Sequence, residues 1–309
     1  MQHVELVEVG PRDGLQNESV SLDLAAKREL IRRLVAAGIR RLEVASFVNP
    51  KKVPQMADAD ELVRSLPKVE GVTYVGLVLN RRGLERAIES GCQEIGMVIV
   101  ASDTFNRRNQ GVSTAESLAA WHEIAAAARQ AGVRAQVTLS AAFGCPFEGE
   151  VPEARVVELA LQAATSAPAE IALADTVGVA VPSQVDSLFR TLRERLPQVP
   201  LRGHFHNTRN TGLANAYAAL QAGASALDAS IGGIGGCPFA PAATGNIPSE
   251  DLLYMLERMN VHTGVSLEAM LETSRWIEAR LGRSVPGMLV KSGGFPRPAA
   301  RGSANRGNA

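Results

Sequence analysis

The feature that most constrains the fold of this chain is a regular alternation of short apolar runs and longer amphipathic segments. Eight apolar runs occur, and they span residues 4–9, 41–45, 72–79, 95–100, 133–139, 170–174, 201–206 and 226–230. Continuous apolar runs of this length are typical of parallel strands that are buried on both faces. Because parallel strands are joined by crossover helices, the alternation predicts repeated βα units.

The helical segments carry start and stop signals where this alternation requires them. The first runs from Leu24 to Gly38, and the fourth opens with Ser113 and Glu116, which have the spacing of a capping box. The sixth begins behind Pro182, since a proline at a helix start loses no hydrogen bond. The other segments cover 57–66, 82–90, 152–166, 212–222 and 248–259.

Eight βα units in succession predict an α/β fold of the closed (β/α)₈ TIM-barrel type. The alternative is a doubly wound open sheet, but no Gly-x-Gly-x-x-Gly follows the first run, and we expect no strand pair to be joined by a hairpin turn. A helical pattern at 267–281 predicts a C-terminal helical cap. We assign residues 1–291 to the barrel with its cap and expect 292–309, which lacks apolar periodicity, to form a disordered tail.

The overall composition narrows the class of function. Basic and acidic residues are equal at 32 each, so the chain has no basic field for nucleic acid or an anionic membrane. No apolar run approaches the roughly 18 residues that cross a bilayer, and a strand that starts at Val4 is expected to leave no room for a signal peptide. Three cysteines are too few for a disulfide framework. We therefore expect a cytoplasmic protein that acts on a small molecule and binds neither nucleic acid nor membrane.

Polar side chains follow nearly every predicted strand, whereas the strand interiors are expected to be apolar. In an α/β barrel the C-terminal ends of the strands meet at one rim, where the chemistry takes place. One such residue alone is more often a cap or a turn residue, and the whole set is what indicates a site. In chain order the candidates are Arg12, Asp13, Gln16, Glu43, Ser46, Asn109, Ser140, Asp175, Thr176, His204, His206, Cys237 and Asn246.

Two histidines and a cysteine give the clearest sign of chemistry. His204 and His206 are two residues apart at the end of a predicted strand, so both imidazoles point to one face and form half of a metal site. Cys237 follows on a glycine-rich loop, where it is a candidate acid or base that swings over a substrate. Cys92 and Cys145 are expected to be packing residues.

These motifs resemble those of the 3-hydroxy-3-methylglutaryl-CoA lyase family, and the likeness extends over residues 4–282. The matching segments are GPRDGLQNE at 10–18, Glu43 with SFV at 46–48 and VPQM at 53–56, GCPFEG at 144–149, DTVG at 175–178, and GIGGCPFA at 233–240 leading to Gly245 and Asn246. The wider superfamily of pyruvate carboxyltransferases and carboxylate synthases shares some of these motifs. The synthases, however, carry Glu-Arg in place of Gly-Cys-Pro in the loop and have a long regulatory domain.

The resemblance implies roles for most of the rim residues. It implies Mg²⁺ or Mn²⁺ as the cofactor, with oxygen and imidazole ligands that suit these ions better than a structural zinc. The implied ligands are Asp13, His204, His206 and Asn246. The implied catalytic residues are Arg12, which stabilises an enolate, Cys237, which transfers a proton, and Glu43 and Asp175, which handle protons or support the metal. The implied acyl-CoA contacts are Arg12, Gln16, Ser46 and Asn109.

The activity that the resemblance implies is retro-Claisen cleavage of 3-hydroxy-3-methylglutaryl-CoA to acetyl-CoA and acetoacetate, a reaction of leucine degradation and ketone-body metabolism. One departure keeps a related 3-hydroxyacyl-CoA such as citramalyl-CoA as an alternative substrate. Asn207 stands where the family has an aspartate and Arg209 where it has a tyrosine, and we expect both changes to make the local potential more positive. A Claisen-type synthase and a non-catalytic barrel are less favoured interpretations, and a homodimer is left open.

Overall fold

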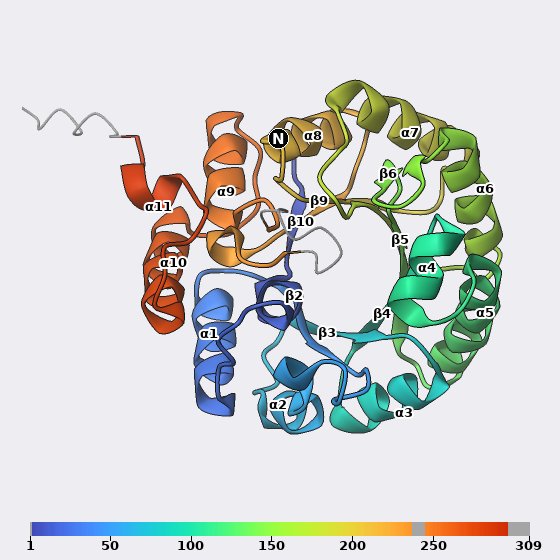
Figure 1. The fold of residues 1–309 in the computed structure, drawn as a ribbon. Coiled ribbons are helices and arrows are strands. Elements are labelled where there is room, and N and C mark those ends of the chain that lie inside the picture. Colours follow the sequence, from blue (N-terminus) through green and yellow to red (C-terminus); the bar gives the residue numbers. More distant parts are fainter. Residues whose placement is uncertain (1, 237–244, 296–309) are drawn as a thin grey trace, which may run out of the picture.

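The computed structural model describes residues 2–236 and 245–295, and it confirms the closed parallel barrel with a ring of helices around it (Figure 1). Neighbouring strands follow the closed order β1-β10-β9-β8-β5-β4-β3-β2. The barrel strands are β1 (Glu5–Glu8), β2 (Arg41–Ser46), β3 (Thr73–Val78), β4 (Glu94–Val100), β5 (Arg134–Ser140), β8 (Ile171–Asp175), β9 (Leu201–Phe205) and β10 (Ala226–Ala229).

The helices of the outer ring follow the predicted segments to within a few residues. They are α1 (Leu24–Ala36), α2 (Ala59–Ser65), α3 (Arg81–Ser90), α5 (Thr114–Gln130), α6 (Glu153–Ala164), α7 (Pro182–Arg195), α8 (Gly212–Gln221) and α9 (Ser249–Arg258). The predicted cap is present as α10 (Leu267–Leu281), which packs against α1 and α9. Among the described residues, no helix combines the length and the apolar character that a bilayer crossing needs.

Several short elements were not predicted from the sequence. Helix α4 (Asp103–Gln110) and the turns η1 (Gly10–Gly14), η2 (Pro54–Met56) and η3 (Ile231–Gly233) all lie in the connections between strands and helices. The expectation of no hairpin was wrong, because β6 (Gly144–Cys145) and β7 (Gly149–Glu150) pair in antiparallel fashion. Strands of two residues are too short to produce an alternation that could be seen in a sequence.

The structure describes only residues 292–295 of the predicted tail. A short helix, α11 (Leu289–Ser292), ends at residue 292, the first residue of the expected tail. Residues 296–309 lie outside the described part of the chain, so the tail itself stays a prediction.

The expectation that the strand interiors are apolar was also wrong, because charged side chains lie inside the barrel. Arg41 donates to both carboxylate oxygens of Glu170 at 3.0 Å and also to Glu94. Nε of Arg202 lies 3.0 Å from the same Glu170. All four side chains are buried, and Arg41, Glu94 and Arg202 stand at or next to the N-terminal ends of their strands. Since chemistry in these barrels lies at the opposite ends, this ionic layer is structural.

Candidate active site

A tight turn directly after β1 places Arg12 and Asp13 at the C-terminal rim. Their backbone N–H groups both donate to the carbonyl of Val9, at 3.1 and 2.7 Å, which curls the chain into the π-helical turn η1. Gly14 allows the turn to pack closely, because a Cβ atom there would lie 2.7 Å from a side-chain carbon of Ile234. The sequence Gly-Pro-Arg-Asp-Gly therefore presents a cation and an anion side by side.

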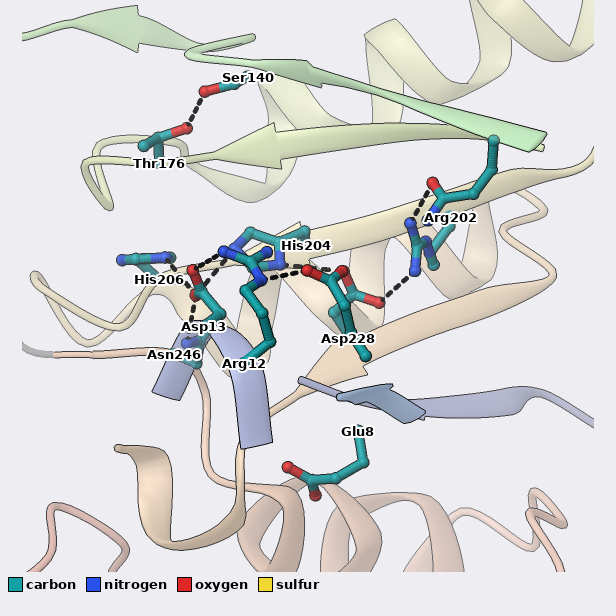
Figure 2. Close-up of polar contacts among 12 residues, drawn as sticks. Glu8, Arg12, Asp13, Ser140, Thr176, Arg202, His204, His206, Asp228 and Asn246 are labelled. Carbon is teal, nitrogen blue, oxygen red and sulfur yellow. Dashed lines mark hydrogen bonds and ion pairs between the residues drawn. The ribbon is translucent and has the colours of Figure 1, made fainter. Parts of the chain in front are cut away.

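Three of the four implied metal ligands converge on one point (Figure 2). Nε2 of His204 lies 4.0 Å, and Nε2 of His206 lies 3.8 Å, from Oδ2 of Asp13. Candidate ligand atoms of the three side chains all lie within 4.8 Å of one another. As the spacing predicted, the two imidazoles share a face, with their ring centroids 5.2 Å apart.

Asn246 completes this group from the far side of the glycine-rich loop. Its Nδ2 donates to Oδ2 of Asp13 at 2.8 Å. Its Oδ1 is buried and finds no hydrogen-bond partner within the described residues. Since a buried polar atom is normally paired, an unpaired amide oxygen beside a carboxylate and two imidazoles fits a metal ligand. The four residues, called the metal residues below, thus suit a divalent cation.

At Asp13 and His206, the electrostatics of the site favour the protonation states that a cation needs. Burial opposes ionisation of Asp13, but Arg12 and the two histidines outweigh it and lower its pKa to about 2. Burial, together with the neighbouring His204, lowers the pKa of His206 to about 4. At neutral pH the carboxylate is therefore ionised and the His206 imidazole is neutral, as metal ligands must be.

Arg12 is held between two carboxylates. Its NH1 group donates to Oδ1 of Asp13 at 2.8 Å, and its Nε donates to Glu43 on β2. Both Arg12 and Glu43 are buried. Glu43 therefore contacts the site only through Arg12 in the described contacts, and it fixes the position of the Arg12 guanidinium beside the metal residues.

Asp175 ends β8 and organises the loop that follows. Its two carboxylate oxygens accept from the N–H groups of Val179 and Ala180 at 2.9 and 3.0 Å. Burial raises the pKa of Asp175 in spite of these bonds. Its backbone carbonyl accepts from the N–H of His206 at 3.3 Å, so this carboxyl group lies on the strand next to the metal residues.

The residues that the resemblance implies as acyl-CoA contacts differ in burial. Oγ of Ser46 and Oε1 of Gln16 are buried and have no hydrogen-bond partner in the part of the chain that the structure describes. Asn109 is exposed near the end of α4, and none of its described contacts joins it to the metal residues. Ser140 and Thr176, from neighbouring strand ends, hydrogen-bond to each other at 2.8 Å (Figure 2).

Cys237 lies outside the described residues, so its role stays a prediction. The described chain before it is anchored at the site, since Nδ2 of Asn17 donates to the carbonyl of Gly236 at 2.8 Å. The chain after it resumes at Gly245, whose carbonyl accepts from the N–H of Asn207 at 3.0 Å. The other two cysteines are buried, as their interpretation as packing residues predicted.

The two departures from the family pattern both bind backbone groups. NH1 of Arg209 donates to the carbonyls of Val177 and Gly178 at 3.2 and 2.9 Å, which ties the loop after β9 to the loop after β8. Oδ1 of Asn207 accepts from the N–H of Gly212, the first residue of α8, at 3.1 Å. Both residues therefore have local structural roles, and their expected effect on the potential stays a prediction.

Glu8 was not singled out from the sequence, although it supports the site from behind. Its carboxylate accepts from the N–H groups of Gly10 and Ile231 and from Oγ of Ser249, at 2.8, 2.9 and 2.6 Å. It thereby joins the start of η1, the glycine-rich loop and the start of α9. Burial raises its pKa to about 8. The available signal was a second glutamate in the otherwise apolar run ELVEVG, three residues after Glu5.

Comparison with known proteins shows the family of the chain. A family model described as HMGL-like matches residues 3–277. The (R)-citramalyl-CoA lyase of Chloroflexus aurantiacus is 46% identical over 303 residues, covering 95% of this chain and 96% of that protein. The crystal structure of Bacillus subtilis HMG-CoA lyase matches with a TM-score of 0.92 at 41% identity, covering 94% of this chain and 98% of that one.

A further solved structure is an HMG-CoA lyase from Acinetobacter baumannii in complex with coenzyme A and 3-methylmalate. It matches with a TM-score of 0.91 at 38% identity and covers 96% of this chain and 98% of that one. The family model and these relatives match most of the chain. The chain therefore belongs to the HMGL-like family, and it is a carbon–carbon lyase of the hydroxymethylglutaryl-CoA lyase type.

Proposed function

We propose that the protein cleaves 3-hydroxy-3-methylglutaryl-CoA to acetyl-CoA and acetoacetate with the help of Mg²⁺ or Mn²⁺. The observation that carries the proposal is the convergence of Asp13, His204 and His206 beside the Arg12 guanidinium. These three residues and Asn246 would hold the ion. When bound, it would act as a Lewis acid toward oxygen atoms of the substrate.

The residues around this group supply the remaining chemistry of the proposal. A base takes the proton of the tertiary hydroxyl, the bond between C2 and C3 breaks, and its electrons move to the thioester carbonyl as an enolate. Arg12 donates hydrogen bonds to the enolate oxygen, where a fixed buried cation is most effective. Asp175 is our candidate for the base, because burial raises its pKa.

The last step is protonation of the enolate carbon, which gives the methyl group of acetyl-CoA. We assign this proton to Cys237, since positive charge from Arg12 and the proposed ion would lower the pKa of a nearby thiol and let it exchange a proton. Buried Ser46 and Gln16 are our candidates for acyl-CoA contacts. Asn109, exposed on α4, stays a candidate for the coenzyme A end of the substrate.

A second substrate is favoured by two of the comparisons. The relative at 46% identity is an (R)-citramalyl-CoA lyase, and the Acinetobacter structure holds 3-methylmalate, an isomer of citramalate. Citramalyl-CoA has the same 3-hydroxy-3-methyl centre but lacks one methylene before the free carboxylate. Its cleavage by the same steps yields acetyl-CoA and pyruvate.

The experiment that decides is a comparison of the two thioesters at saturating Mg²⁺ and Mn²⁺. Acetyl-CoA release is followed for both, and acetoacetate and pyruvate are assayed separately. A kcat/KM at least 10-fold higher for the methylglutaryl thioester supports the proposal, because one methylene in a binding pocket is worth about 10- to 200-fold. The reverse ratio assigns the enzyme to citramalyl-CoA, and cleavage of neither thioester rejects both. A cytoplasmic location and the homodimer alternative stay predictions.

A further inference from the structure

Asp228, on β10, lies directly behind the metal residues, and each of its carboxylate oxygens has its own partner (Figure 2). Oδ2 lies 3.0 Å from Nδ1 of His204, and Oδ1 accepts from NH1 of Arg202 at 3.1 Å. The carboxylate is buried, and the rim chemistry described above does not use it.

The contact with Asp228 leaves one ring nitrogen of His204 free to bind a metal. A histidine that ligates a metal uses one ring nitrogen, and the partner of the other nitrogen fixes the tautomer and the ring orientation. For His204 the free nitrogen is Nε2, which points toward Asp13. His206 has no such support, because its Nδ1 is buried without a partner among the described residues. His204 is therefore the oriented ligand of the pair.

Arg202 in turn holds Asp228 from the interior of the barrel. It stands two residues before His204 on β9, so both side chains point to the same face of the strand. Arg202 is itself fixed, because NH2 donates to Oε1 of Gln136 at 2.6 Å and Nε lies 3.0 Å from Glu170. A chain of contacts thus runs from the ionic layer through Arg202 and Asp228 to His204.

We propose that Asp228 is a positioning residue of the metal centre, which holds His204 with its Nε2 lone pair toward Asp13 and Asn246. Arg202 keeps the carboxylate in the orientation that this requires. The proposal rests on the proposed metal-dependent function, and it adds a residue that acts on affinity for the ion through His204.

The test is Asp228→Asn in the full-length chain. Metal-stripped protein is titrated with Mn²⁺, and free Mn²⁺ is followed by electron paramagnetic resonance. We expect a Kd that is about 10- to 100-fold weaker than in the wild type, as is typical when the partner of a ligating histidine is changed. We also expect kcat to recover at saturating Mn²⁺, because the reacting groups are untouched. A folded variant with the Kd of the wild type overturns the proposal.

Glu94→Gln is the matched control. Glu94 is an equally buried carboxylate of the barrel interior, but it pairs with Arg41 and with none of the metal residues in the described contacts. We expect a lower Tm and an unchanged Kd for Mn²⁺. An equal loss of Mn²⁺ affinity in both variants would mean that any damage to the ionic network weakens the site, and it would also overturn the proposal.

A second measurement applies even where Asp228→Asn does not fold. Histidine labelled with ¹⁵N reports the tautomer in the metal-free wild type, at an alkaline pH where the spectrum shows that the His204 ring has lost its second proton. The His204 signals are assigned with a His204→Gln variant. Protonation at Nδ1 is expected, and protonation at Nε2 contradicts the proposal. Because this readout needs neither metal nor turnover, it also separates a failure of this proposal from a failure of the proposed function.

Discussion

Arg12→Gln is the substitution whose consequences the structure defines most fully. Arg12 donates to Asp13 and to Glu43, so its removal leaves two carboxylates without their shared cation. Breaking a buried pair on one side typically costs about 3–5 kcal/mol of stability. Asp13 is partly exposed, so we take the lower end, about 3 kcal/mol, which corresponds to a fall in Tm of roughly 5 °C for a chain of this size.

The same variant should lose turnover by a separate mechanism. An electrostatic group that opposes charge in the transition state is worth about 10²- to 10³-fold in kcat. Because that charge is absent in the bound substrate, kcat should fall far more than KM rises. Initial rates of acetyl-CoA release over a range of substrate concentrations separate these two parameters.

A double variant distinguishes the two effects. Adding Glu43→Gln to Arg12→Gln removes one of the stranded charges, so most of the lost Tm should return while kcat stays low. Calorimetry and steady-state kinetics on the same preparations provide both numbers. A single variant with the Tm and kcat of the wild type, or a loss confined to KM, would refute this account of Arg12.

Three further perturbations follow from the site. His206→Ala should abolish metal-supported turnover while circular dichroism stays native, and full activity of exhaustively chelated wild type would contradict the metal site. The pKa of Glu8 is raised to about 8 in the folded protein. The stability of the wild type relative to Glu8→Gln should therefore be highest below about pH 4.5 and should fall as pH rises toward 8. Parallel curves of Tm against pH for the two proteins would argue against this. Alkylation should inactivate through Cys237 with protection by substrate, and Cys92→Ser should behave as wild type, because burial raises the pKa of the Cys92 thiol to about 12. Equal sensitivity of Cys92 and Cys237 to alkylation would rule out the loop assignment.

The sequence by itself determined the barrel and the histidine pair. Both are local patterns: eight apolar runs that alternate with helical segments, and two histidines that a strand places on one face. Motifs such as Gly10–Gly14 and the glycine-rich loop pointed to the family, and the family model and relatives confirm that assignment.

Only the tertiary structure shows which residues contact the histidine pair and Asp13. Asp13 and Asn246 are 233 positions apart, and only closure of the barrel between β1 and β10 brings them to a 2.8 Å contact. Asp228 and Arg202 sit inside apolar-looking runs, where one charged residue hardly changes the pattern. Their importance follows from pairing across neighbouring strands, since a charge enters a core when a partner from another strand offsets the loss of water.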